Sequence, residues 1–263
     1  MNAQGTLTNG YDLEQRPGTT RILFVGSKAT YDGKLIAAVG NTPGAETLEV
    51  WNGGIPAYGA VQLANFYKRD QSQIRPDRVV MVLSPNDIET TPIASLGPNN
   101  EVVAFAPYGP RGTLNPTLFQ YSYLSRLLLG LTTRFSHGEQ QLLLEIQDRL
   151  ADLRAFLKKD HVDLVVVVMP LLLPEDMWTA DQKERRRAIL EILQNVGLRH
   201  IDLLPALGSS LSQQTNLHEH PGNPLEPSGD PARIVADYLR QQGLDLGGMM
   251  QSSAHSADHQ RAA

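Results

Sequence analysis

A hydroxyl and an amine stand next to each other where the first apolar run of the chain ends. Residues 21–26 read Arg-Ile-Leu-Phe-Val-Gly, and Ser27 and Lys28 follow directly. A serine becomes a nucleophile when a base removes its proton, and a lysine amine can be that base. Adjacent residues rarely turn their side chains toward each other, however. The pair therefore predicts either an unusual Ser-Lys nucleophile or a serine that only caps the following turn.

Polar and glycine-rich residues also follow the next two apolar runs. Residues 52–59 read Asn-Gly-Gly-Ile-Pro-Ala-Tyr-Gly and come after the run 47–51, while Asn86 and Asp87 come after the run 77–83. Ligands of open α/β sheets bind where the strands end at their carboxyl side. These segments are therefore the candidate functional site.

The residues around Ser27 resemble block I of the SGNH/GDSL hydrolases, in which a strand ends in Gly-Asp-Ser-x-Thr and the serine attacks an ester. Positions 26–30 here read Gly-Ser-Lys-Ala-Thr. Without gaps, Ser27 stands on the family's Asp and Lys28 on its catalytic Ser. An amine cannot replace that hydroxyl in the family's acyl-enzyme chemistry. The resemblance therefore implies the fold of the family without its usual nucleophile, with Gly26 as a supporting residue.

The segment 52–59 is similar to the family's block II, Asn-x-Gly-Val-Pro-Gly-Tyr. Gly54 matches the first glycine of that block. Ala57 stands on the second, whose backbone N–H contributes to the oxyanion hole in the family. Alanine keeps the N–H, so an oxyanion role for Ala57 is compatible with the change. The position does demand a φ value that a Cβ tolerates.

Residues 84–87 read Ser-Pro-Asn-Asp and resemble block III, which is Gly-x-Asn-Asp in the family. Ser84 replaces the glycine. The resemblance implies that Asn86 completes an oxyanion hole and that Asp87 holds its loop by hydrogen bonds. In a chain without activity, both residues would be retained because they stabilise the loop.

The last block, Asp-x-x-His-Pro in the family, fits this sequence in two registers. Counting back from the last predicted helix without gaps places Asn223 on the Asp and Glu226 on the His. The other register takes His220 as the family's His, and Leu217 then replaces the Asp. In neither register do Ser, His and Asp all stand in place.

The resemblance therefore favours a degenerate, non-catalytic SGNH protein that binds an acylated or carbohydrate ligand or an enzyme partner. In this hypothesis Lys28 and Glu226 form an ion pair across the former active site. The alternative is an atypical ester hydrolase or acyltransferase. It would use Ser27 as nucleophile, His220 as base, and Ala57 and Asn86 as oxyanion donors.

The elements around these blocks alternate between strand-length apolar runs and helical periodicity, the pattern of a parallel sheet covered on both faces. We expect a three-layer α/β/α sandwich, flavodoxin-like, with a mostly parallel five-stranded sheet. The expected strands are 21–26, 47–51, 77–83, 163–169 and 200–203, and the expected helices are 61–69, 138–159, 180–195 and 231–241. One domain would span 19–243, with a loop or cap at 88–118 and an irregular stretch at 209–229. A flexible segment, 1–18, would precede the domain, and a disordered tail, 244–263, would follow it.

Composition limits the remaining classes of function. The net charge of −5 and a run of arginines at 185–187, expected on a solvated helix face, argue against nucleic-acid binding. The longest apolar run, 164–173, is interrupted by Pro170 and too short for a bilayer, so no membrane association is expected. No signal peptide is seen, which predicts the cytoplasm unless a leader is missing. The chain lacks cysteine, and His218 and His220 have no evident third ligand, so neither a metal nor a cofactor is expected.

Overall fold

The computed structural model describes most of the predicted domain. The described residues are 13–42, 47–88, 93–96, 102–105, 138–212, 217, 224–225 and 227–242. Asn223, Glu226 and His220 of the last block, His218 and the predicted tail lie outside these ranges.

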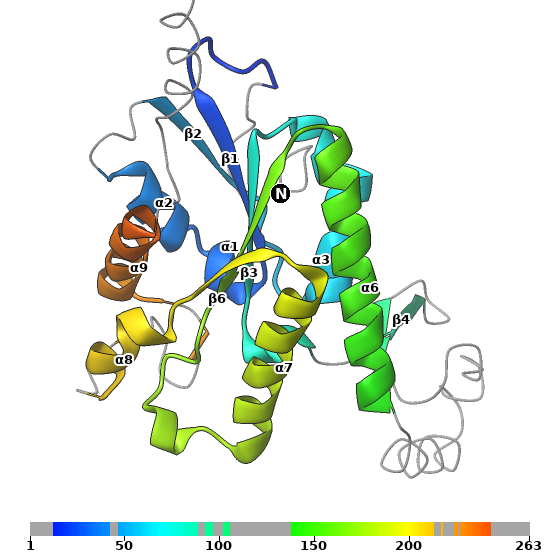
Figure 1. Ribbon diagram of the computed structural model, residues 1–263, viewed down its shortest axis with the longest axis vertical. Coiled ribbons are helices and arrows are strands. Elements are labelled where there is room, and N and C mark those ends of the chain that lie inside the picture. The colour runs from blue at the N-terminus through cyan, green and yellow to red at the C-terminus, as the bar shows by residue number, and fades with distance from the viewer. Residues whose placement is uncertain are drawn as a thin grey trace, which may run out of the picture.

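A single parallel sheet of five strands forms the centre of the molecule (Figure 1). The strand order is β2-β1-β3-β6-β7, and every neighbouring pair is parallel. The strands are β1 Thr20–Gly26, β2 Leu48–Asn52, β3 Arg78–Leu83, β6 Asp163–Val168 and β7 Arg199–Asp202. Each lies within one residue, at either end, of the run that predicted it. The prediction of a mostly parallel five-stranded sheet is confirmed, because strands buried on both faces read as continuous apolar runs.

Helices cover both faces of this sheet, as Figure 1 shows. Alternate residues of β1 and β3 point to opposite faces, so the core divides into two apolar clusters. One face packs against α2 Lys34–Gly40, α8 Leu204–Ser212 and α9 Gly229–Gln241. The other packs against α3 Ala60–Phe66, α6 Gly138–Lys159 and α7 Ala180–Val196. The three-layer sandwich is therefore confirmed.

Helix α7 has a capping motif at its start and a glycine stop at its end. In α7, the Thr179 hydroxyl accepts from the Gln182 N–H at 3.2 Å, and the Gln182 side chain accepts from the Thr179 N–H at 2.9 Å. This reciprocal pair satisfies N–H groups at the helix start, as the capping box predicts. Gly197 ends α7 with φ +69°, a left-handed value that glycine adopts without strain.

Several short elements were not predicted. The segment expected to be a loop or cap at 88–118 contains an antiparallel ribbon of β4 Ile93–Leu96 and β5 Val102–Phe105. α1 Lys28–Tyr31, α2 and α8 were also missed, and α8 overlaps the stretch 209–229 that was expected to be irregular. Elements this short show little periodicity, and their stability comes from tertiary packing rather than from local sequence.

A buried ion pair joins the amino ends of β1 and β2. Arg21 and Glu49 are register partners, and the Arg21 Nε donates to Glu49 Oε2 at 2.8 Å. The two side chains are only 1% and 7% exposed. Arg21 also donates to the Ile74 carbonyl at 2.8 Å, and its guanidinium lies 4.6 Å from the centre of the Trp51 ring. The charge of Arg21 is thus matched by an anion, a carbonyl and an aromatic face.

Glu49 also holds part of the segment that precedes β1. Its Oε1 accepts from the Arg16 N–H at 2.8 Å and from the Thr19 hydroxyl at 3.0 Å. Arg21 in turn donates to the Leu13 carbonyl at 3.0 Å. Leu13 and Arg16, which belong to the segment 1–18 predicted to be flexible, are therefore hydrogen-bonded to the strands.

These contacts make stability depend on pH through Glu49. Burial by itself raises the pKa of the Glu49 carboxyl, but hydrogen bonds from the Arg16 N–H and from the Arg21, Thr19 and Arg16 side chains outweigh it and lower the pKa from 4.5 to about 2. Since the folded pKa lies below the unfolded one, the contribution is fully present above about pH 4.5 and is lost as the pH falls toward about 2. We expect the urea midpoint to fall across this window. Glu49→Gln should show a flatter dependence, and an equal dependence in both proteins would contradict the assignment.

Candidate functional site

The candidate site lies at the carboxyl ends of β1 and β3. The chain passes from β1 to β2 on one side and then to β3 on the other, so the direction of winding reverses between β1 and β3. Open α/β sheets bind their ligands at such a switch point, outside the carboxyl ends of the strands. Ser27 follows β1, while Ser84 and the 3₁₀ turn Pro85–Ile88 follow β3.

A single carboxylate ties the ends of these two strands together. The Ser27 hydroxyl donates to Asp87 Oδ1 at 2.5 Å. The other oxygen, Asp87 Oδ2, accepts from the Ser84 N–H at 2.6 Å and from the Ser84 hydroxyl at 2.8 Å. All three residues are buried, with exposed fractions of 2–5%. Three hydrogen bonds from two strand ends meet at this one side chain, so the cluster of Ser27, Ser84 and Asp87 links the adjacent strands β1 and β3.

Lys28 lies beside this cluster as the first residue of α1 and is half-buried. Within the described part of the chain, no carboxylate forms an ion pair with Lys28, and no contact joins its amine to the Ser27 hydroxyl. The Ser27 proton points instead to Asp87. The predicted ion pair with Glu226 and the base role of His220 involve residues outside the described ranges and stay predictions.

Close backbone packing explains two of the glycines of the blocks. A Cβ on Gly26 would lie 2.9 Å from the Thr30 hydroxyl oxygen, and a Cβ on Gly54 would lie 2.5 Å from the same atom. The Thr30 hydroxyl donates to the Ser27 carbonyl at 3.1 Å. These contacts leave no room for a side chain, so both glycines are supporting residues of the turn that carries Ser27.

The turn after β2 is fixed by its own polar side chain and by a glutamine from a distant turn. Asn52 Oδ1 accepts from the Gly54 N–H at 2.9 Å, and Asn52 Nδ2 donates to the Tyr31 carbonyl at 3.2 Å. Gln71, which is completely buried, donates to the Gly53 carbonyl at 3.0 Å. It ends the π-helical turn Tyr67–Gln71, which continues α3 beyond the predicted helix.

The two predicted oxyanion donors lie on the loops that follow β2 and β3. Ala57 is exposed and adopts φ +64°, in the left-handed region where the family's glycine is the easier residue. Asn86 is half-buried in the 3₁₀ turn beside Asp87. The structure describes the backbone at both positions, and the role of the two residues as oxyanion donors stays a prediction.

Sequence reasoning missed two members of this site. Ser84 was noted only as the replacement of a glycine, but its hydroxyl and its N–H both bind Asp87. The signal was available, since Ser and Asp three residues apart after a strand form local turns of this kind. Gln71 left no such signal, because its contact with Gly53 spans 18 residues.

Two negative findings apply to the described ranges. They contain no group of three or more His, Asp or Glu side chains that would hold a metal ion. None of their helices combines the length and the apolar character needed to cross a bilayer.

No family model matches this chain, and no curated protein matches it. Several solved structures are similar to it in fold. The acetylxylan esterase Axe2 from Geobacillus stearothermophilus aligns with 88% of this chain and 98% of its own, at a TM-score of 0.55 and 15% identity. LAE5, an alpha/beta hydrolase enzyme from the metagenome of Lake Arreo in Spain, aligns with 85% of this chain and 95% of its own, at a TM-score of 0.55 and 14% identity.

A lipolytic protein of the G-D-S-L family from Desulfitobacterium hafniense DCB-2 aligns with 85% of this chain and 99% of its own, at a TM-score of 0.51 and 14% identity. These likenesses extend over nearly the full length of each of the three proteins. The chain therefore has the α/β/α fold of the SGNH/GDSL hydrolases, as its block motifs predicted. At such low identity the likeness concerns the fold alone.

Proposed function

We propose that this chain is an SGNH-fold protein that does not hydrolyse esters and acts by binding an acylated carbohydrate at the carboxyl edge of its sheet. The observation that carries the proposal is the burial of Ser27, which is 5% exposed and whose hydroxyl donates to Asp87 at 2.5 Å. The hydroxyl nearest to the family's nucleophile position is thus part of a buried structural cluster.

Two chemical reasons support the absence of turnover. A carboxylate has an ordinary pKa of about 4 and is a weak base toward a hydroxyl, so the Ser27–Asp87 bond orients the hydroxyl without activating it. Lys28, which stands on the nucleophile position, offers an amine. Attack of an amine on an ester would release the alcohol and leave an amide on the lysine, which water does not cleave readily. Neither side chain supports repeated acyl transfer.

Two observations support the class of ligand: the turns around Ser27 are preserved, and several similar structures are acetylxylan esterases. The glycines and Asn52 around Ser27 preserve the turns of the site although the nucleophile position has changed. Several of the similar structures are acetylxylan esterases, which act on acetylated polysaccharide. A protein that retained these turns and lost ester hydrolysis would still be able to bind such a ligand.

The test is reaction with a fluorophosphonate serine probe and with p-nitrophenyl acetate, using Ser27→Ala as the matched control. We expect no labelling and no turnover above buffer in either protein. Labelling and turnover that disappear in Ser27→Ala would overturn the proposal. They would establish the alternative, an ester hydrolase or acyltransferase with Ser27 as nucleophile.

A further inference from the structure

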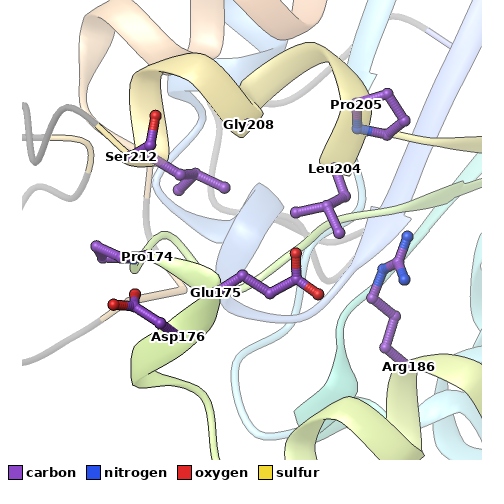
Figure 2. Close-up of a pocket in the computed structure, with 9 residues that line it drawn as sticks. Pro174, Glu175, Asp176, Arg186, Leu204, Pro205, Gly208 and Ser212 are labelled. Carbon is purple, nitrogen blue, oxygen red and sulfur yellow. The ribbon is translucent and has the colours of Figure 1, made fainter.

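A groove at the carboxyl edge of the sheet, beyond β6 and β7, is separate from the candidate site. It has a volume of about 620 Å³ and lies between the segment that follows β6 and helix α8, which follows β7 (Figure 2). Neither Ser27 nor Asp87 lines it. What binds in the groove therefore depends on the groove's own wall, charges and rim.

One wall of the groove is apolar. Leu204, Pro205 and Leu211 of α8 form this wall, and Pro174 lines the groove from the segment after β6. Gly208 lies between Pro205 and Leu211 on the same helix. A Cβ at Gly208 would meet no atom within 4 Å, so the groove is open at this point. The wall therefore offers apolar surface to a partner that approaches from solvent.

The cation at one end of the groove is neutralised by the protein itself. Arg186 projects from α7, and its guanidinium forms an ion pair with Asp202, whose carboxylate also accepts from the Leu204 N–H at 3.2 Å. The Arg186 side chain is 17% exposed, so the sequence prediction of a solvated arginine face is wrong for this residue. The physical reason is that α7 turns Arg186 toward the end of β7. Arg186 therefore adds no uncompensated charge to the groove.

Two carboxylates carry the uncompensated charge of the groove. Glu175 and Asp176 are exposed on the 3₁₀ turn Glu175–Met177, and in Figure 2 the Glu175 side chain extends into the space between this turn and Arg186. Within the described part of the chain, neither carboxylate forms an ion pair, and Arg186 is the only other charged residue that lines the groove. The groove is therefore negative, as is the chain with its net charge of −5, and both attract a cationic partner.

An exposed methionine lies on the same turn as the two carboxylates. Met177 is 61% exposed, and its N–H donates to the carbonyl of the groove residue Pro174 at 2.9 Å. The next residue, Trp178, is buried and donates from its ring to the Leu173 carbonyl at 3.0 Å. The turn is thus anchored to the domain while Met177 stays in solvent. Methionine is enriched where proteins bind other proteins, so its place beside an apolar wall indicates a protein-binding surface.

These features favour a segment of protein over a small cation. A small organic cation binds best in an enclosed site, commonly over the face of an aromatic ring. Here both carboxylates are exposed, and no aromatic residue is among the described residues that line the groove. In a peptide of basic and apolar residues, the basic side chains can pair with Glu175 and Asp176 while the aliphatic ones pack on the proline and leucine wall.

We infer that the groove and the turn Glu175–Met177 form a docking surface for a basic amphipathic segment of a partner protein. Lysine or arginine side chains of the segment pair with Glu175 and Asp176, and its apolar side chains cover the α8 wall and Met177. An apolar centre with charged groups at its rim is the usual arrangement of a protein interface. The surface is distinct from the carbohydrate site proposed at Ser27 and does not depend on it.

The test is a calorimetric titration of the full chain at low salt with an amphipathic peptide, acetyl-Lys-Leu-Leu-Lys-Lys-Leu-Leu-Lys-amide. Glu175→Gln combined with Asp176→Asn removes both charges and keeps the shapes of two exposed side chains. Asp148→Asn combined with Glu191→Gln is the matched control, because these carboxylates are exposed on α6 and α7 and do not line the groove. Circular dichroism checks that every variant is folded.

We expect the peptide to bind the wild type, and the variant without Glu175 and Asp176 to raise the Kd about three- to thirtyfold, because two exposed ion pairs are lost. The control variant should leave the Kd unchanged, since charges far from the peptide are screened. Equal Kd values in the two double variants would overturn the docking surface. An absence of binding to the wild type would also overturn it.

A second pair of variants tests the apolar part of the surface. Met177→Ser and Leu144→Ser each remove a large apolar side chain that is 61% exposed. Leu144 lies on α6 and does not line the groove, so it is the matched control. We expect Met177→Ser to raise the Kd about threefold or more and Leu144→Ser to leave it unchanged. Equal effects of the two substitutions would contradict the place of Met177 in the surface.

Two further ligands distinguish other occupants of the groove. The same peptide with glutamate in place of lysine should not bind, and hexylammonium, a small apolar cation, should bind more weakly than the lysine peptide. Binding of the glutamate peptide would overturn the cationic class of partner. Hexylammonium binding as tight as that of the peptide, and lost without Glu175 and Asp176, would assign the groove to a small cation and overturn the protein partner. None of these outcomes bears on whether Ser27 reacts with the fluorophosphonate.

Discussion

Replacing Asp87 with alanine is expected to lower the free energy of unfolding by about 3–5 kcal/mol, because three buried donors would lose their acceptor. These donors are the Ser27 hydroxyl, the Ser84 hydroxyl and the Ser84 N–H. All belong to residues that are at most 5% exposed, so solvent replaces the carboxylate poorly. Urea denaturation followed by circular dichroism measures the change.

Ser27→Ala is the matched comparison, since it removes the Ser27 hydroxyl and keeps the two hydrogen bonds from Ser84 to the carboxylate. Its cost should be about 1–2 kcal/mol, and a double-mutant cycle of the two positions should show a coupling of about 1 kcal/mol or more. Additive effects would mean that the 2.5 Å contact contributes nothing. A cost below about 1 kcal/mol for Asp87→Ala would contradict the role of this carboxylate as the link between β1 and β3.

Replacing Arg21 with alanine is expected to destabilise the protein by about 3–5 kcal/mol, because it leaves the Glu49 carboxylate buried without its main cation. The guanidinium also contacts the Trp51 ring and the Ile74 carbonyl, and both contacts are lost together with the ion pair. The unfolding transition in urea near neutral pH measures the effect.

A second ion pair at the same edge of the sheet is the control. Arg78 and Asp163 are register partners at the starts of β3 and β6, and their N–O distance is 2.9 Å. The Asp163 side chain is 44% exposed, so Arg78→Ala should cost only about 0–1 kcal/mol. Equal losses in the two variants would show that burial does not determine the contribution of Arg21.

The sequence by itself determined the class of fold. Strands buried on both faces read as apolar runs, and the helices at α6, α7 and α9 carry periodicity over 13 or more residues. These signals are local, so they are visible without the structure. The block motifs indicated the SGNH/GDSL fold in particular, and the structure is similar in fold to a G-D-S-L protein.

Short elements and unusual local structure could not be predicted from these sequence signals. α8 has nine residues, which is too few for a helical period to be recognised. The β4–β5 ribbon lies in a segment rich in Pro, Gly and Asn, a composition that predicts loops. The change from α-helix to π-helix at Tyr67 likewise has no sequence signature, and Gln71, which donates to the Gly53 carbonyl, ends this turn.

Tertiary structure alone decided which polar residues meet. Ser27 and Asp87 are 60 residues apart, and Arg21 and Glu49 are 28 apart. The sequence offered Lys28, Glu226 and His220 as possible partners at this edge, whereas the Ser27 proton is directed at a carboxylate expected only to hold its own loop. The groove depends on Glu175, Arg186 and Gly208, which come from three separate elements. The physical reason is the same in each case: a side chain's partner depends on strand order and helix packing, which bring distant segments together, whereas hydrophobic periodicity reports only on a residue's near neighbours.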